Sequence, residues 1–290
     1  MIYLGLSIVC SSLLFIIFKY FTIYKIDTLK AIVVNYIVAF TLGFVLAENS
    51  ISITNLPNQP WFYSALILGL LFVGVFFIMA LTAQRNGVSV ASIAGKMSLV
   101  VPVFFGVLLY NESLSVIKIL GILIALLAVY LASVKEKNEA NILVKNSLLF
   151  PVLLFLGSGL LDTAIKYIEK NFVAENEVDF FSGSLFGFAA CFGILILIVK
   201  EIKNRKSFGY KNIIAGIVLG IPNYYSIVFL IKALQIKGVE SSTVFTINNV
   251  AIVIVSTLVG LLLFKETFSL NNKIGIVLAI VGVFLVAIAS

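Results

Sequence analysis

The stretch GVSVASIAGKMSLVVPVFFGVLLYNESLSVIKILG, residues 87–121, decides how this chain folds. Its apolar run from Val88 to Tyr110 is long enough to cross about 30 Å of hydrocarbon as a helix. The run contains a single lysine, Lys96, and it is followed by a polar turn before the next apolar run begins. The pattern predicts two membrane-spanning helices joined by a tight turn, with a cation inside the first.

A related stretch, GVESSTVFTINNVAIVIVSTLVGLLLFKETFSLNNKIG, occupies residues 238–275. The shift that aligns Glu112 with Glu266 also aligns Gly121 with Gly275 and many apolar positions around them. The pattern therefore occurs twice in one chain, which predicts an internal repeat.

The composition excludes a soluble globular domain. The chain has 290 residues, of which 61% are hydrophobic and only 11% are charged, and its mean hydropathy is +1.17. Such values are typical of a polytopic membrane protein. The sequence has no histidine, which excludes His-ligated metals and Ser-His or Cys-His catalysis.

Apolar runs of roughly 17 to 25 residues are long enough to span a bilayer as helices. Ten such runs predict an all-α integral membrane protein of ten transmembrane helices, and they lie at residues 2–18, 29–47, 61–82, 88–110, 115–133, 147–165, 180–199, 213–234, 239–264 and 274–289. The first five form one repeat, 1–134, and the last five form the other, 147–290, with a charged linker at 135–146. Because five is an odd number, the second repeat enters the membrane inverted, an arrangement typical of alternating-access transporters.

Two motifs carry a resemblance to a known family. The segments LLYNESLS, residues 108–115, and LLFKETFS, residues 262–269, each precede a glycine and an Ala/Gly-rich apolar run. Together with the ten spans they resemble the EamA-type family of the drug/metabolite transporter superfamily over the whole chain. The resemblance implies a 5+5 inverted repeat and a permease that exports or exchanges small metabolites. It does not name the cargo, since members carry amino acids, sugar phosphates or nucleotide sugars.

Lys96 is the first candidate for substrate binding. It lies about 12 Å from the start of its predicted helix, too deep for its side chain to reach the interface easily. A lysine in a membrane span is costly unless it faces a cavity or a partner, which makes it a functional-site hypothesis. We expect its ammonium to bind a carboxylate or phosphate of the substrate, or to couple its charge state to transport. Structural hydrogen bonding to neighbouring helices is the competing interpretation.

Several uncharged polar residues lie at mid-depth in other spans. Asn248 and Asn249 lie in the ninth span, beside the position that aligns with Lys96, and Asn35 lies in the second. We expect these amides to line the substrate cavity, although interhelical hydrogen bonds worth about 1 kcal/mol are the alternative role.

The eighth span is interrupted by Pro222, which removes a helix hydrogen bond and predicts a kink. Asn223, Tyr224 and Tyr225 follow it and supply an amide and two hydroxyls suited to a cavity wall. A kink that serves packing alone is the alternative. Pro102 in the fourth span has the same two readings, and we assign it mainly to gating geometry.

Acidic residues are rare in the spans. Asp162 is followed by Lys166, four residues later on the same helix face, which predicts an internal ion pair. The alternative is that this pair couples transport to a charge. Glu112 and Glu266 lie at span ends and are followed by Ser or Thr, so we interpret them as structural turn residues rather than substrate contacts.

We expect no enzymatic activity and no cofactor, because the spans lack paired carboxylates, a nucleophile elbow and histidine. A channel is disfavoured because rings of like charges are absent from the sequence pattern. The remaining hypotheses are a metabolite transporter, a lipid-linked carrier flippase, and a non-transporting scaffold or sensor. The expected partners are a small-molecule substrate and membrane lipids, and no nucleic acid.

We expect a multi-pass protein of the plasma (inner) membrane. Basic residues concentrate on the loops after odd-numbered spans, which by the positive-inside rule places both termini outside. The resemblance implies termini inside, so the orientation stays open. Gly183-xxx-Gly187 and Gly216-xxx-Gly220 are close-packing ridges that fit either a homodimer or a contact within the chain.

Overall fold

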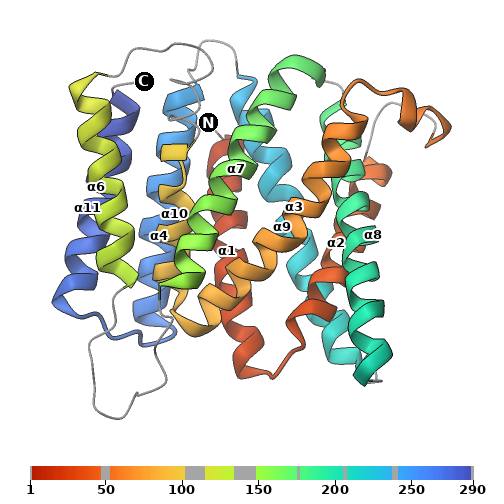
Figure 1. The fold of residues 1–290 in the computed structure, drawn as a ribbon, viewed down its shortest axis with the longest axis horizontal. Helices are drawn as coiled ribbons and strands as arrows, with labels where there is room; N and C mark the ends of the chain where they lie inside the picture. Colours follow the sequence, from red (N-terminus) through yellow and green to blue (C-terminus); the bar gives the residue numbers. More distant parts are fainter. Residues whose placement is uncertain are drawn as a thin grey trace. The chain divides into compact units, whose positions relative to one another are not determined.

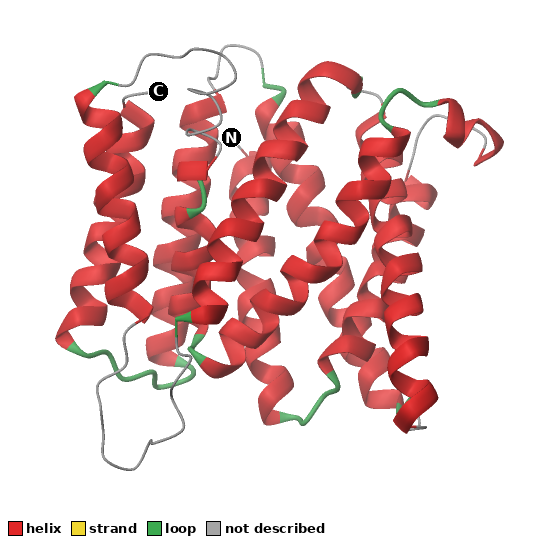
Figure 2. Cartoon of the chain, viewed as in Figure 1, coloured by secondary structure: helices red, strands yellow, loops and turns green. Residues whose placement is uncertain are grey.

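The computed structural model describes residues 2–46, 53–101, 115–133, 148–174, 177–204, 208–236 and 241–288. Within these ranges the regular secondary structure is helical, and loops and turns join the helices (Figure 2). The helices labelled in Figure 1 are α1 (Ile2–Ile23), α2 (Thr28–Leu46), α3 (Phe62–Arg85), α4 (Val88–Met97), α6 (Val116–Ser133), α7 (Leu149–Phe172), α8 (Val178–Asn204), α9 (Tyr210–Leu234), α10 (Ser241–Leu262) and α11 (Leu270–Ile288). A short 3-10 helix, Ile53–Asn58, precedes α3.

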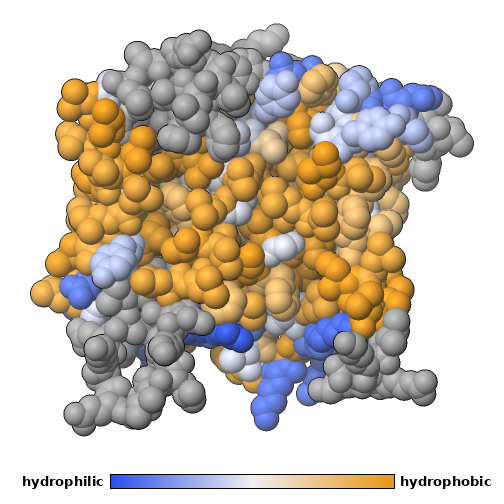
Figure 3. Space-filling view, viewed as in Figure 1, coloured by the Kyte–Doolittle hydropathy of each residue, from blue (hydrophilic) through white to orange (hydrophobic). Residues whose placement is uncertain are grey.

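The helices have the length and composition of membrane spans. Five are long and apolar enough to cross a bilayer, namely α1, α2, α3, most of α8 and α9, and the other five contain shorter apolar segments. Hydrophobic side chains cover most of the described surface on the face drawn in Figure 3. The all-α membrane architecture is therefore confirmed, whereas the count of ten complete spans stays a prediction.

The chain divides into two compact units, and each unit draws on both halves of the sequence. Unit 1 consists of Met1–Phe77 and Ala164–Gly238, and unit 2 consists of Ile78–Thr163 and Val239–Ser290. The boundaries fall inside α3 and α7, so these two helices contribute to both units.

In unit 1, α2 packs against α8 and α9, and α1 packs against α9. Glycines make these contacts close. An added Cβ at Gly183 of α8 would lie 3.0 Å from the Cα of Gly43 in α2. On α9, an added Cβ at Gly216 would lie 2.7 Å from the Ala31 carbonyl oxygen, so α9 also presses its backbone against α2. Both predicted glycine ridges thus make contacts within the chain.

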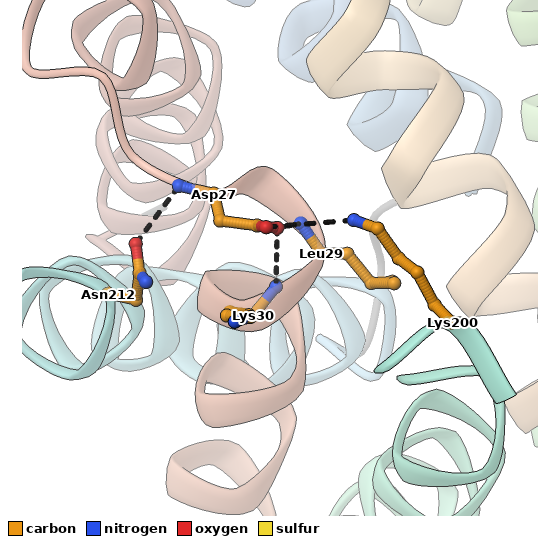
Figure 4. Close-up of polar contacts among 5 residues, drawn as sticks. All are labelled: Asp27, Leu29, Lys30, Lys200 and Asn212. Atoms are coloured by element: carbon orange, nitrogen blue, oxygen red, sulfur yellow. Dashed lines mark hydrogen bonds and ion pairs between the residues drawn. The ribbon is translucent and has the colours of Figure 1, made fainter. Parts of the chain in front are cut away.

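The start of α2 is fixed by one aspartate (Figure 4). Asp27 Oδ1 accepts hydrogen bonds from the backbone amides of Leu29 at 3.1 Å and Lys30 at 3.3 Å, which caps the helix. Its own amide donates to Asn212 Oδ1 of α9 at 2.9 Å, and its Oδ2 lies 3.6 Å from Lys200 Nζ of α8. One residue therefore links the N-terminus of α2 to both neighbouring helices.

In unit 2, α6 packs against α11, and α4 packs against α10. An added Cβ at Gly275 of α11 would lie 2.6 Å from the amide nitrogen of Ala132, and one at Gly282 would lie 3.1 Å from that of Ala125. Small residues thus let the backbones of α6 and α11 approach closely, as is typical of helix pairs in membranes.

We expect Gly183→Val to destabilise unit 1, because a larger side chain cannot fit where α8 meets Gly43. Overpacking of this kind costs about 1–3 kcal/mol. Gly74→Val in α3 is the matched control, since an added Cβ there meets no described atom within 4 Å. Thermal unfolding of the detergent-purified variants measures the effect, and equal melting temperatures for the two would contradict it.

Candidate functional site

The helix that carries Lys96 ends directly after it. Helix α4 ends at Met97, and a turn at residues 98–99 separates it from the helical residues Val100 and Val101. Two hydrogen bonds of the tighter i to i+3 type cross this turn, from the Leu99 amide to the Lys96 carbonyl and from the Val101 amide to the Ser98 carbonyl. The uninterrupted helix expected from Val88 to Tyr110 is therefore broken at its lysine.

The sequence contains a physical reason for this break. Pro102 has no amide hydrogen, so a continuous helix would leave the Ser98 carbonyl without its usual i+4 donor. The structure satisfies that carbonyl through Val101 instead. Pro102 itself, with the rest of residues 102–114, lies outside the described part of the chain, so its role in gating stays a prediction.

Helix α7 packs against the same turn through a glycine. An added Cβ at Gly159 would lie 2.9 Å from the Ser98 carbonyl oxygen and would collide with the Val101 side chain. This close approach brings the next turn of α7, which carries Asp162, to the level of Ser98. The Ser98 hydroxyl donates a long hydrogen bond of 3.4 Å to Asp162 Oδ2 and a shorter one of 2.5 Å to the Gly95 carbonyl.

Asp162 is also the carboxylate whose charge acts on Lys96. The two groups are near enough to interact electrostatically, and both residues are partly exposed. Within the described part of the chain, however, no carboxylate oxygen lies within 4.0 Å of the Lys96 ammonium. Lys96 lies in the last turn of α4, where the negative end of the helix dipole also favours a cation. The Asp162 carboxylate therefore offsets the charge of the Lys96 ammonium without contacting it directly.

The expected partner of Asp162 was Lys166. The side chain of Lys166 lies outside what the structure describes, so that ion pair stays a prediction. What the sequence did not reveal is the approach of Asp162 to Lys96, which comes from a different part of the chain. Its only sequence signal is Gly159, one turn before the aspartate on the same helix face.

Asn248 and Asn249 belong to the same unit as Lys96. Their side chains are buried, with 1% and 3% of their surface exposed, and Asn248 Oδ1 has no hydrogen-bond partner among the described residues. Helix α10 packs along α4, and Ser89 of α4 meets Gly260 of α10 at one end of the contact. Distances along both helices can be measured from this Ser89–Gly260 contact at about 1.5 Å per residue. On that scale Asn249 lies about one helical turn further from the contact than Lys96 does.

The other predicted binding residues lie in unit 1. Asn223 Nδ2 of α9 donates to Asn35 Oδ1 of α2 at 3.1 Å, and Asn35 Nδ2 donates to the Ile32 carbonyl at 3.4 Å. Both asparagines are buried, with at most 1% of their surface exposed. Ser226 Oγ donates to the Asn223 carbonyl at 2.8 Å. This pair therefore joins α2 to α9 next to Pro222, which lies inside the continuous helix α9.

A charged group that sequence analysis missed lies beside the tyrosines. The hydroxyl of Tyr224 donates to Asp179 Oδ1 at 2.7 Å, and Lys232 Nζ lies 3.4 Å from Asp179 Oδ2. Asp179 lies directly before the predicted seventh span, 180–199, and therefore outside the spans in which the sequence analysis looks for site residues. Tyr225 packs against Tyr224 and Phe229 through ring contacts of 5.2 Å.

Glu266 has a structural role, as interpreted from the sequence. Its carboxylate accepts hydrogen bonds from the amides of Val88 and Ser89 at the start of α4. Glu112, its counterpart in the repeat, lies outside the described residues. Nowhere in the described ranges do three or more acidic or cysteine side chains gather as a metal site would require.

A comparison with protein families identifies the chain. The model of the EamA-like transporter family matches residues 1–134 and 147–288. The chain belongs to this family. It is therefore a multi-pass membrane transporter, in a family of transporters rather than enzymes, and the resemblance seen in the sequence is confirmed.

Two relatives extend this result. An uncharacterised protein of Haemophilus influenzae (strain Rd) is 30% identical over 285 residues, which cover 96% of this chain and 94% of the relative. A solved crystal structure matches 99% of this chain and 97% of its own with a TM-score of 0.63 at 16% identity. At that identity the likeness shows the fold alone.

We expect Tyr224→Phe to destabilise the protein, because it leaves the Asp179 carboxylate without its short hydrogen bond. Hydrogen bonds to charged groups contribute about 1.5–3 kcal/mol. Tyr225→Phe is the matched control, since the Tyr225 hydroxyl makes no hydrogen bond within the described part of the chain. Thermal unfolding compares the two variants, and an equal loss of stability would show that the hydroxyl of Tyr224 does not matter.

Proposed function

We propose that this transporter moves a small polar metabolite across the membrane by alternating access, and that Lys96 recognises an anionic group of that metabolite. The observation that carries the proposal is the position of Lys96 in the last turn of α4, directly before Ser98, whose hydroxyl lies 3.4 Å from Asp162 Oδ2. We also propose that the protein acts in the plasma (inner) membrane and works in the export direction.

The energetics of charge in a membrane support this role. An ionised side chain is stable inside a bundle only when a partner or a polar cavity compensates it. A purely structural pair gains most when its charges meet directly, with further hydrogen bonds to both groups. Lys96 and Asp162 instead interact without a contact ion pair, and both are partly exposed. This geometry leaves the ammonium able to bind a second anion.

The broken helix supports the same interpretation. In secondary transporters, substrate sites form at discontinuous helices because the interruption leaves backbone groups and helix ends facing the substrate. The turn at residues 98–99 is such an interruption, and Lys96, Ser98 and Asp162 surround it. Asn248 supplies a buried amide oxygen without a described partner in the same unit. Because this oxygen only accepts hydrogen bonds, it suits an N–H or O–H donor of the metabolite rather than its anionic group. We propose that Asn248 and Asn249 contact this polar part of the metabolite.

The polar residues of unit 1 support a different contribution. Asn35 and Asn223 hydrogen-bond one another, so we propose that they couple α2 to α9 rather than bind substrate in this conformation. Tyr224 holds Asp179. Tyr225 is the remaining candidate for contact with the metabolite, because it is partly exposed and adjacent to this pair.

A thermal-stability screen of the purified protein against carboxylates and phosphates tests the anion site. A ligand at about 100 times its dissociation constant stabilises a protein by about 2.7 kcal/mol. We expect some anions to raise the melting temperature of the wild type but not of Lys96→Gln. Lys211→Gln is the control, because Lys211 is an exposed lysine in the first turn of α9 and should leave the response unchanged. Stabilisation by lipids alone would favour a flippase of lipid-linked carriers instead.

A second variant tests the competition between Asp162 and the substrate. We expect Asp162→Asn to bind the stabilising anion about tenfold more tightly, as relief of about 1.4 kcal/mol of competition for Lys96 would give. The same variant should be less stable without ligand, because Lys96 loses its counter-charge. Isothermal titration of the purified variant measures the affinity. Weaker binding would mean that the carboxylate itself contributes to recognition.

A further inference from the structure

The carboxylate of Glu266 binds the first turn of α4. Oε1 accepts a hydrogen bond of 2.7 Å from the Val88 amide, and Oε2 accepts bonds of 3.4 Å from the Ser89 amide and 3.0 Å from the Ser89 hydroxyl. Glu266 belongs to the turn between α10 and α11, far along the chain. The α10–α11 turn therefore supplies the acceptor that the start of another helix needs.

Helix α4 lacks a cap of its own. Its N-cap residue is Gly87, which has a φ of 111° and no side-chain hydrogen bond. The first amides of any helix have no partner within the helix. These groups need an acceptor from outside the helix. Glu266 meets this need, and its negative charge also suits the positive end of the helix dipole.

The carboxylate fits tightly between two glycines. An added Cβ at Gly87 would lie 2.8 Å from Glu266 Oε1, and one at Gly260 would lie 2.6 Å from Oε2. The backbone of Glu266 is held as well, since its amide donates to the Gly260 carbonyl at 3.0 Å. Neither glycine position tolerates a side chain without moving the carboxylate, so both glycines are needed for this contact between α4 and the α10–α11 turn.

Because α4 is a ten-residue helix, fixing one end fixes the other. Lys96 lies in its last turn, about 12 Å along the axis from Val88. We propose that Glu266 is a positioning residue for Lys96: by anchoring the start of α4 to the α10–α11 turn, it sets the depth at which the ammonium is presented beside Asp162. The proposal rests on the proposed function only in treating Lys96 as the recognition residue.

A cysteine at position 96 reports this depth without any substrate. In a background with Cys10→Ala and Cys191→Ala, Lys96→Cys is labelled with the cationic thiol reagent 2-(trimethylammonium)ethyl methanethiosulfonate. Adding Glu266→Ala should raise the labelling rate about fivefold, because an unanchored α4 no longer holds position 96 at a fixed depth and loss of a helix cap costs about 1 kcal/mol. Glu177→Gln is the control, since Glu177 is a partly exposed acid outside this cluster and should leave the rate unchanged.

A further variant separates positioning from simple capping. Ser89→Asp, combined with Glu266→Ala, returns a negative charge to the first turn of α4 but does not restore the link to the α10–α11 turn. We expect the labelling rate to stay altered in this double variant. A rate that returns to that of Lys96→Cys alone would show that Glu266 only caps the helix, and an unchanged rate in Glu266→Ala would overturn the proposal outright.

If Glu266→Ala does not fold, Glu266→Gln replaces it. Its amide oxygen can still accept from Val88, but its amide group cannot accept from Ser89, so a smaller change in the same direction is expected. The labelling assay does not depend on which metabolite binds. The labelling rate of Lys96→Cys could change in Glu266→Ala while Lys96→Gln still binds anions as the wild type does. That result would refute the proposed function and leave the positioning role intact.

Discussion

In a hydrocarbon layer there is no water to satisfy polar groups, so each amide, carbonyl and charge must find its partner within the protein. Helix starts face a related constraint, because their first amides have no partner within the helix. Asp27 caps α2, and Glu266 caps α4 from a distant part of the chain. The lack of water explains why Lys96 lies where Asp162 and the end of a helix dipole both favour its charge.

Close backbone contacts bring these polar and charged groups near enough to their partners. Gly159 lets α7 approach the turn after α4, which brings Asp162 within reach of Lys96. Gly87 and Gly260 leave room for the Glu266 carboxylate between α4 and α10. In each case a glycine, which has no side chain, leaves room for an acidic group to lie near the partner that it stabilises. Small residues thus have an electrostatic consequence as well as a packing one.

The sequence was sufficient for the all-α membrane fold and its two repeats, because hydrophobic runs and their repetition are local properties of the chain. It also singled out Lys96, since one lysine in a long apolar run stands out by composition alone. It could not pair Asp162 with Lys96, because the i to i+4 rule considers one helix and this contact depends on α7 meeting the turn after α4. Asp179 was missed for a related reason, since its partner Tyr224 lies on another helix.

The break at Ser98 shows how these features combine. A helix that ended without a cap at its start and without compensation at its lysine would be free to slide or unwind, because a ten-residue helix has little stability of its own. Glu266 removes that freedom at one end, and the packing of α7 on Ser98 restricts it at the other. What remains variable is the charge balance at Lys96, where Asp162 interacts without a contact ion pair. A rigidly held cation with an incomplete counter-charge is suited to exchange one anionic partner for another.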